Sequence, residues 1–174
     1  EDGVEAYVCP MLIPSSHPLA SVNDSYNAVF VNGDAVENAM FYGRGAGELP
    51  TASAVVGDLF EIVRNIQANC CACIGCTCYK ELPVKKMADT CNRYFMRLIV
   101  EDRCGVLAEM TAVFAKYGVS VAQIIQKAAR DEGSAEVVVI TAKVREGDFR
   151  TAMEELSGRS SVRKISSMLR VYGE

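Results

Sequence analysis

A glycine-rich loop is the first segment of this 174-residue chain whose residue types suit a chemical task. Gly43, Gly45 and Gly47 run into a helix that we predict over about residues 50–68. Pro50 suits the first turn of that helix because no hydrogen bond is lost there. Backbone N–H groups at a helix start attract anions, and glycine lets a ligand approach the backbone closely. The residues alone leave two interpretations open: an anion-binding loop, or a tight turn without a ligand.

Five of the eight cysteines crowd together between residues 70 and 78. Cys70, Cys73 and Cys76 have the spacing that opens an iron–sulfur site, and Cys78 or Cys91 could complete a tetrathiolate zinc site. However, a lysine stands where the bacterial ferredoxin pattern has its fourth cysteine, and a zinc site would need a second Cys-x-x-Cys arm. We therefore expect no metal, and free thiols that pack as small hydrophobic side chains.

His17 is the only histidine and lies between Ser16 and Pro18 in a predicted loop. A loop histidine is usually solvated or hydrogen-bonded, and an auxiliary role in acid–base chemistry is the alternative. No Cys–His or Ser–His pair is recognisable from the sequence.

The elements around these residues fall into two regions. In the first, residues 4–13 are β-prone, and residues 27–32 and 35–42 read as two strands. The Asn32-Gly33-Asp34 segment between these strands predicts a tight hairpin turn with positive φ. In the helix that follows, Val55, Leu59 and Ile66 belong to one apolar stripe.

The second region predicts four strands, over about residues 93–100, 119–127, 135–142 and 162–172. One helix opens at Gly105 and ends at Gly118, and another covers about residues 149–157. The order βαββαβ is that of a ferredoxin-like unit, so the fold class is α+β. Two helices on one face leave the other sheet face, or an edge, for a partner, and dimerisation is expected.

Composition narrows the class of protein. Half of the residues are hydrophobic and 23% are charged, which favours a packed core. The net charge of −4 and the pI near 5.2 argue against a nucleic-acid partner. No apolar run is long enough for a membrane span and no secretion signal is recognisable, so we expect a cytoplasmic protein without a membrane partner. The chain begins with Glu1 and not Met, which suggests a fragment.

Motifs in both regions resemble homoserine dehydrogenases in order and spacing. The first region has His-Pro-Leu-Ala at 17–20, Asn-Ala-Val at 27–29, Phe-Tyr-Gly-x-Gly-Ala-Gly at 41–47 and Pro-Thr-Ala-Ser-Ala-Val-Val-x-Asp at 50–58. Arg44 replaces the usual proline of the glycine loop. The segment Asp-Arg-Cys-Gly-Val-Leu at 102–107 resembles the ACT-domain signature, with Cys104 where that family usually has proline. The resemblance covers nearly all of the chain except about residues 70–92.

This resemblance implies the C-terminal portion of a homoserine dehydrogenase. Residues 1–69 would end the catalytic and dimerisation domain, residues 70–92 would be a Cys-rich linker, and residues 93–174 an ACT regulatory domain. The family enzyme is an oxidoreductase of threonine and methionine biosynthesis that interconverts L-aspartate 4-semialdehyde and L-homoserine with NAD or NADP. The family's Rossmann domain and catalytic lysine are absent from these residues. We therefore expect the fragment alone to be inactive and to bind no cofactor.

The resemblance also implies roles for particular residues. In the whole enzyme the dinucleotide would contact the glycine loop near its reactive end, and His17 would be an auxiliary catalytic residue. The cofactor contacts would be Gly43, Gly45, Gly47 and Thr51. In the ACT domain an amino-acid effector, with threonine the best guess, would bind at the helix start within a homodimer or higher homo-oligomer. The effector contacts would be Asp102, Cys104, Gly105, Val106, Leu107 and Gln126.

One detail of the effector site depends on strand geometry. Gln123 and Gln126 are three residues apart and point to opposite faces unless a bulge intervenes, so we expect only one of them at the ligand. We choose Gln126 because its segment matches the family.

Two other functions remain open. A stand-alone ACT-domain sensor is the main alternative, and the glycine-loop motif argues against it because a pure sensor needs no dinucleotide-facing loop. A metal- or redox-sensing protein built on the cysteine cluster is the third reading.

Overall fold

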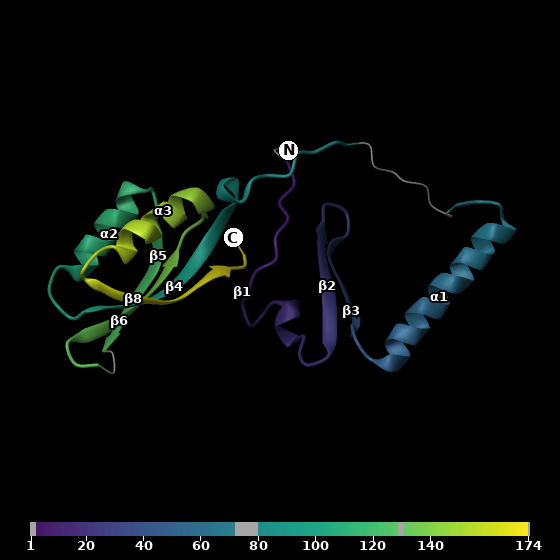
Figure 1. The fold of residues 1–174 in the computed structure, drawn as a ribbon, viewed down its shortest axis with the longest axis horizontal. Helices are drawn as coiled ribbons and strands as arrows, with labels where there is room; N and C mark the ends of the chain where they lie inside the picture. Colours follow the sequence, from purple (N-terminus) through teal and green to yellow (C-terminus); the bar gives the residue numbers. More distant parts are fainter. Residues whose placement is uncertain (1–2, 72–79, 129–130, 174) are drawn as a thin grey trace. The chain divides into compact units, whose positions relative to one another are not determined.

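The chain divides into two structural units. The computed structural model describes residues 3–71, 80–128 and 131–173. One unit, which we call the sheet unit, combines Glu1–Ile13 with Leu82–Glu174. The other, the hairpin unit, is Pro14–Glu81. Figure 1 traces both units along the chain.

The hairpin unit is named for its two antiparallel strands, β2 (Tyr26–Gly33) and β3 (Glu37–Arg44), which confirm the two strands expected there. A 3-10 helix, η1 (Pro18–Ser21), precedes them. The expected positive φ at the Asn-Gly turn is wrong. Gly33 is the last strand residue and pairs with Glu37, so the loop has three residues, and the positive φ of 54° falls on Glu37. A left-handed residue after the turn is usual in three-residue hairpin loops.

Helix α1 (Glu48–Gln67) follows the glycine loop, with Gly47 at its N-cap and Pro50 in its first turn. Its apolar residues form the stripe that the sequence predicts, but none of the helix is buried. Leu59 is 55% exposed and Ile66 is 72% exposed. Most of the driving force for an amphipathic helix comes from burying its apolar face, so α1 has a face suited to packing against further protein.

The sheet unit has the βαββαβ order that the sequence predicts. Its main elements are β4 (Cys91–Glu101), α2 (Val106–Lys116), β5 (Val121–Ala128), β6 (Ser134–Thr141), α3 (Glu146–Ser157) and β8 (Val162–Val171). The sheet order is β1-β8-β4-β6-β5, and the four main strands pair antiparallel. Three short elements complete the unit: β1 (Met11–Leu12), the 3-10 helix η2 (Met87–Asp89) and β7 (Val144–Arg145).

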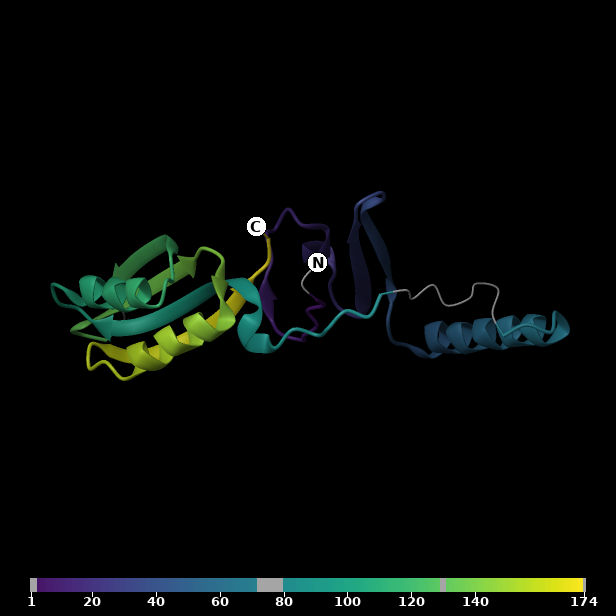
Figure 2. The ribbon, with the colours of Figure 1, turned by 90° about the horizontal axis from the view of Figure 1, so that it is seen from above.

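The core lies between one face of this sheet and helices α2 and α3. Figures 1 and 2 show the two helices packed beside the sheet. Alternate residues of β4, namely Tyr94, Met96, Leu98 and Val100, are buried, as the two-residue period of a strand requires. Met110 of α2 and Phe149 of α3 belong to the same core. The opposite sheet face stays half-exposed, which agrees with the expectation of a face or edge left for a partner.

The first residues of the chain group with the sheet unit, whereas the sequence analysis places them in the first region. Strand β1 pairs in parallel with β8, with Met11 opposite Arg170 and Leu12 opposite Val171. A two-residue strand gives little sequence signal, and its partner is more than 150 residues away along the chain. None of the helices in the described ranges has the length and apolar character of a membrane span.

Candidate cofactor loop and effector site

The three glycines that could contact a cofactor differ in what a side chain would meet at each position. Gly43 lies in β3 opposite Asn27, and a side chain there would enter open space. Gly45 donates its N–H to the Ser25 carbonyl at 3.4 Å, and a Cβ on it would overlap the Asn27 side-chain amide. Gly47 has a φ of 127°, which side chains rarely adopt. A side chain at Gly45 would therefore need Asn27 to move, while a side chain at Gly43 would meet open space.

The start of α1 presents backbone donors next to this loop. Thr51 N–H donates to the Gly47 carbonyl at 3.1 Å, which closes the first turn. The N–H groups of Glu48 and Leu49 precede it and belong to the residues that an α-helix leaves unpaired at its start. Glu48 also places a carboxylate in this turn. The added negative charge makes the loop better suited to a neutral part of a dinucleotide than to its phosphates.

His17 is positioned by its own loop. It caps η1, and its Nδ1 accepts a hydrogen bond from the Leu19 N–H at 3.2 Å. Its backbone N–H donates to the Pro14 carbonyl at 2.9 Å. The imidazole packs against Phe30 of β2 with ring centroids 4.6 Å apart. These contacts fix the direction of the ring.

The predicted effector residues 102–107 connect β4 to α2. Gly105 is the N-cap of α2 with a φ of 91°, and Glu109 N–H donates to its carbonyl at 2.9 Å. Val106 is buried and Leu107 packs on the core, so these two hold the helix start in place. Cys104 is exposed beside them. A Cβ on Gly105 would meet no heavy atom within 4 Å, so the space before the first turn of α2 is open.

The charged side chains of this loop pair with one another, so the N–H groups at the start of α2 are the donors open to an anion. Arg103 is held by two carboxylates, Glu101 and Glu109, each at 2.9 Å. Its charge is therefore compensated within the loop. Asp102 donates its N–H to the Gly133 carbonyl at 3.2 Å, which ties the loop to the turn before β6. With Asp102 and first-turn Glu109 beside a single arginine the side-chain charge here is negative, so a ligand carboxylate would depend on the first-turn N–H groups of α2.

Strand register places Gln126 on the sheet face that carries α2, on β5, which β6 separates from β4. Gln126 pairs with Val137, which pairs with Leu98 of β4, and both of these are on the buried face that carries the helices. Directly paired residues share a face, so Gln126 lies on the same side of the sheet as α2. Gln123 pairs with Ile140, farther from the loop and on the opposite face. The bulge in β5 precedes Gln123 and leaves the two glutamines on opposite faces.

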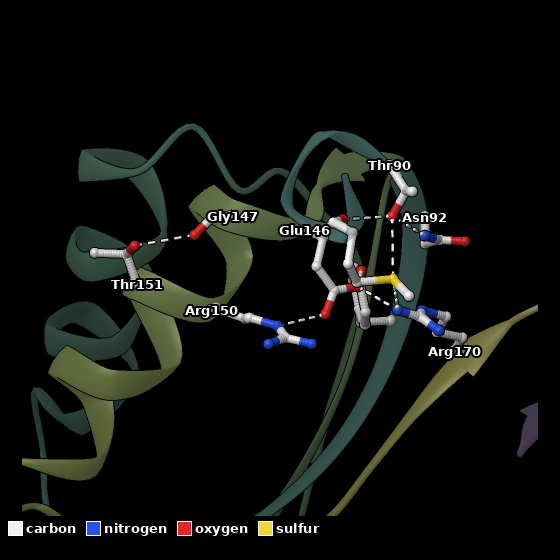
Figure 3. A network of polar contacts seen from close by, with 9 residues as sticks. Thr90, Asn92, Glu146, Gly147, Arg150, Thr151 and Arg170 are labelled. Atoms are coloured by element: carbon white, nitrogen blue, oxygen red, sulfur yellow. Dashed lines mark hydrogen bonds and ion pairs between the residues drawn. The ribbon is translucent and has the colours of Figure 1, made fainter. Parts of the chain in front are cut away.

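A buried charged cluster was missed by the sequence analysis. Glu146, the first residue of α3, accepts hydrogen bonds from Arg150 and Arg170 at 2.6 Å each, and from the Tyr94 hydroxyl. Figure 3 shows the two guanidinium groups reaching the Glu146 carboxylate from different elements. Burial opposes ionisation of Glu146, but these hydrogen bonds outweigh it and lower its pKa. Burial and the bond to Glu146 raise the pKa of Tyr94 to about 12.

The only sequence signal for this cluster is an arginine between the apolar residues Leu169 and Val171 of a strand. Such an arginine implies a partner, but not which one.

The cysteine cluster lies largely outside the described residues, since Cys73, Cys76 and Cys78 fall in the gap between 71 and 80. Cys70 and Cys71 are exposed free thiols. The expectation of free thiols without metal therefore stays a prediction.

Comparison with known proteins bears on both halves of the chain. Residues 2–60 match the homoserine dehydrogenase family, and residues 94–159 match the ACT domain. The chain is 40% identical to homoserine dehydrogenase from Corynebacterium glutamicum over 171 residues, and 41% identical to that from Synechocystis over 175 residues. Both halves of the chain are therefore similar to homoserine dehydrogenases. The chain matches a C-terminal region of that family together with its ACT domain, as the motifs predict.

These matches include nearly all of this chain but less than half of each relative. Both alignments include 98% of this chain but only 38% of the Corynebacterium protein and 40% of the Synechocystis protein. Solved structures agree. A homoserine dehydrogenase from Thiobacillus denitrificans matches 99% of this chain with a TM-score of 0.86 and 30% identity, covering 40% of that structure. A Staphylococcus aureus homoserine dehydrogenase matches with a TM-score of 0.54 and 28% identity. The chain thus spans about two fifths of the relatives' length.

Proposed function

We propose that this chain contributes the C-terminal part of a cytoplasmic homoserine dehydrogenase that interconverts L-aspartate 4-semialdehyde and L-homoserine with NAD or NADP. The observation that carries the proposal is Gly47. Its φ of 127°, which side chains rarely adopt, lies within the family match at the start of α1, and glycine lets a ligand approach the backbone closely. The exposed apolar face of α1 supports the proposal, because it needs the rest of a catalytic domain to cover it.

The glycine loop would meet the reactive end of the dinucleotide. Gly43, Gly47 and Thr51 would line the approach, and Gly45 would keep β3 close to Asn27. The bound dinucleotide supplies the acceptor or donor for hydride. The chain's own residues position it: Glu48 disfavours a phosphate at this place, and the backbone of Gly47 allows close approach. His17 would take an auxiliary part in acid–base chemistry.

The ACT domain would bind an amino acid in a dimer. The start of α2 at Gly105 suits the carboxylate, while Asp102 and Gln126 offer acceptors for the ammonium and hydroxyl groups. Asp102, Cys104, Val106 and Leu107 would shape the rest of the site. Threonine is the preferred ligand because it is made from homoserine. The dimer would form through β5, an edge strand on which Ile124 and Ile125 are exposed.

The chain alone should lack dehydrogenase activity, because the residues that bind the bulk of the dinucleotide and the catalytic lysine are not among its residues. Homoserine-dependent reduction of NAD or NADP is the assay. A chimera tests whether the chain works within a whole enzyme. In it, this chain replaces the matched region of the Corynebacterium protein, to which it aligns over 171 residues. We expect the chimera to be active.

A matched pair of variants in that chimera tests the cofactor loop. Gly47→Val should raise the KM for the dinucleotide or lower kcat, because a side chain would intrude where backbone must approach. Gly118→Val, at another positive-φ glycine, is the control for backbone strain. Activity of the isolated chain, or unchanged kinetics for a folded Gly47→Val chimera, would refute the proposal.

A further inference from the structure

A small cavity lies in the sheet unit where β4 begins and β8 ends. Its volume is about 150 Å³. The residues that line it include Cys91, Asn92, Arg93, Lys143 and Tyr172. The proposed effector loop follows the other end of β4, after Glu101, so the cavity is a separate place in the fold.

Two cationic side chains line this cavity. Arg93 is half-buried, and its Nε donates to the Thr141 carbonyl at 3.4 Å, which holds it beside the segment that contains Lys143. Lys143 is exposed and forms no ion pair with the residues that the structure describes. No aspartate or glutamate is among the described residues that line the cavity. The charge of the cavity wall is therefore positive.

This wall differs from the rest of the sheet unit, in which most arginine side chains face carboxylates. The pairs are Arg97–Glu136, Arg103–Glu101, Arg145–Asp89, Arg150–Glu146, Arg159–Glu155 and Arg170–Glu146. Two positive charges that face one small space repel each other, and an anion between them replaces that repulsion with attraction. Electrostatics therefore favours an anion in the cavity, although the whole chain has a net charge of −4.

The size of the cavity limits the kind of anion. A water molecule takes up about 30 Å³ in the liquid, so the cavity has room for about five waters. A phosphate group fits this space, whereas a dinucleotide does not. A zwitterionic amino acid is a poor match, because no carboxylate among the described lining residues would pair with its ammonium group. Arginine and lysine side chains are the usual partners of phosphate oxygens.

We propose that this cavity binds a small oxyanion of the phosphate class, held by Arg93 and Lys143. The ligand is free phosphate or the phosphate group of a small ester, since both present the same charged oxygens. The site uses neither the cofactor loop nor the effector loop, so its test is separate from that of the proposed function.

Cys91 provides a reporter for an anion in the cavity, because it is an exposed free thiol in the cavity wall. Iodoacetate and iodoacetamide both alkylate a thiolate, whose sulfur displaces iodide and forms a thioether, but only iodoacetate is negatively charged. The ratio of the two rates therefore measures attraction of an anion, since a change in the thiolate fraction affects both reagents alike. Cys104 is a second exposed thiol, and it lies in the effector loop away from the cavity.

The experiment alkylates the complete 174-residue chain at about pH 8, where part of each thiol is ionised. Phosphate or glycerol phosphate is added at an ionic strength matched with NaCl, and peptide mass spectrometry follows Cys91 and Cys104. With a Kd of about 1 mM, about 10 mM phosphate should slow the alkylation of Cys91 by iodoacetate roughly tenfold and leave Cys104 unchanged. Protection by phosphate alone would identify free phosphate as the ligand, and equal protection by glycerol phosphate would show that an ester also fits.

A matched pair of variants tests the role of Lys143. Lys143→Gln should lower the ratio of iodoacetate to iodoacetamide rates at Cys91 and abolish protection by phosphate. Lys164→Gln, at an exposed lysine of β8 outside the cavity wall, should change neither. Slowing of Cys91 by phosphate no greater than that by NaCl would overturn the proposal. Protection that persists in Lys143→Gln would also overturn it.

Discussion

Two glycines with positive φ mark the starts of the two helices that carry the proposed sites. Gly47 precedes α1 and Gly105 precedes α2. The sequence predicts both positions, because glycine clusters and helix starts are local signals. The sequence leaves open whether such glycines serve a ligand or only the backbone. At Gly105 the positive φ of 91° by itself favours glycine, and the open space beside it also leaves room for a ligand.

Gly105→Ala should weaken binding of an amino acid by the ACT domain. A Cβ would stand before the first-turn N–H groups of α2, where the ligand carboxylate is proposed to bind. Gly118→Ala is the matched control, because Gly118 lies at the other end of α2 with a φ of 67° and open space around it. Each change should destabilise the fold by about 1–2 kcal/mol through its backbone strain. Only Gly105→Ala should raise the Kd for threonine, by about tenfold or more.

If calorimetry at matched stability gives both variants the same affinity for threonine, Gly105 is not part of the proposed effector site.

The second residue-scale prediction concerns acid stability. Glu155 accepts hydrogen bonds from Lys116 at 2.6 Å, Arg159 at 2.5 Å and Tyr117 at 2.8 Å, and these lower its pKa from 4.5 to about 2. A depressed carboxyl pKa stabilises the folded state above about pH 4.5, and this contribution is lost as the pH falls towards 2. Glu155→Gln should therefore lower the Tm slightly at neutral pH, and the difference from the wild type should shrink on acidification.

The matched control is Glu154→Gln at the neighbouring position of the same helix. Thermal melts at neutral pH and at about pH 3 decide the matter. A Tm difference between Glu155→Gln and the wild type that stays constant over this range would show that the ion pairs do not stabilise the fold.

The Glu146–Arg170 cluster shows where residue-scale prediction ends. Glu146 and Arg170 are separated by 24 residues, and the third partner, Tyr94, by 52 from Glu146. Nothing in the local pattern around Glu146 says that it is buried. Only the tertiary fold brings these charges together, so their pairing could not be predicted from the sequence.

At the scale of elements, the regular strands and helices were predictable and the irregular pieces were not. From Ala135 to Thr141, strand β6 alternates between buried and half-buried residues, and α2 buries Met110, Val113 and Phe114 at helical spacing. Such periodic patterns determine element type. Strand β1 and helix η2 are two or three residues long and exist only through contacts with distant segments. The hairpin loop was misplaced for a related reason, since cross-strand pairing at Gly33 sets its length.

The open edge of the sheet leads to a prediction about dimerisation. Strand β1 covers part of β8 at one edge, while β5 is the other edge. Ile125 lies on β5 and is 50% exposed. Ile125→Lys should raise the dimer dissociation constant by about tenfold or more, because a lysine on an edge strand disfavours pairing with a second copy. Sedimentation velocity over a range of concentrations measures this effect.

Met168→Lys is the control, since Met168 of β8 is 49% exposed on the opposite side of the sheet order. If Ile125→Lys sediments like the wild type while Met168→Lys dissociates, the dimer forms through the β8 side and the proposed interface is wrong.

At the scale of the whole molecule, the chain joins an ACT domain to a segment that matches homoserine dehydrogenases. The hairpin unit leaves the apolar face of α1 exposed, and the sheet unit has a complete core of its own. This contrast explains the proposed division of labour: the sheet unit folds and binds its effector within this chain, whereas the hairpin unit needs further protein to act. The family match over about two fifths of the relatives' length agrees with this division.

The central claim, that the ACT domain senses an amino acid, is tested most directly by calorimetric titration of the 174-residue chain. Threonine, isoleucine, methionine and lysine would be titrated separately, at protein concentrations where sedimentation shows a dimer. We predict saturable heat with threonine, at a stoichiometry fixed by the dimer, because the start of α2 at Gly105 offers a carboxylate site in open space. No heat with any of the four amino acids would contradict the account and leave the ACT domain a purely structural module.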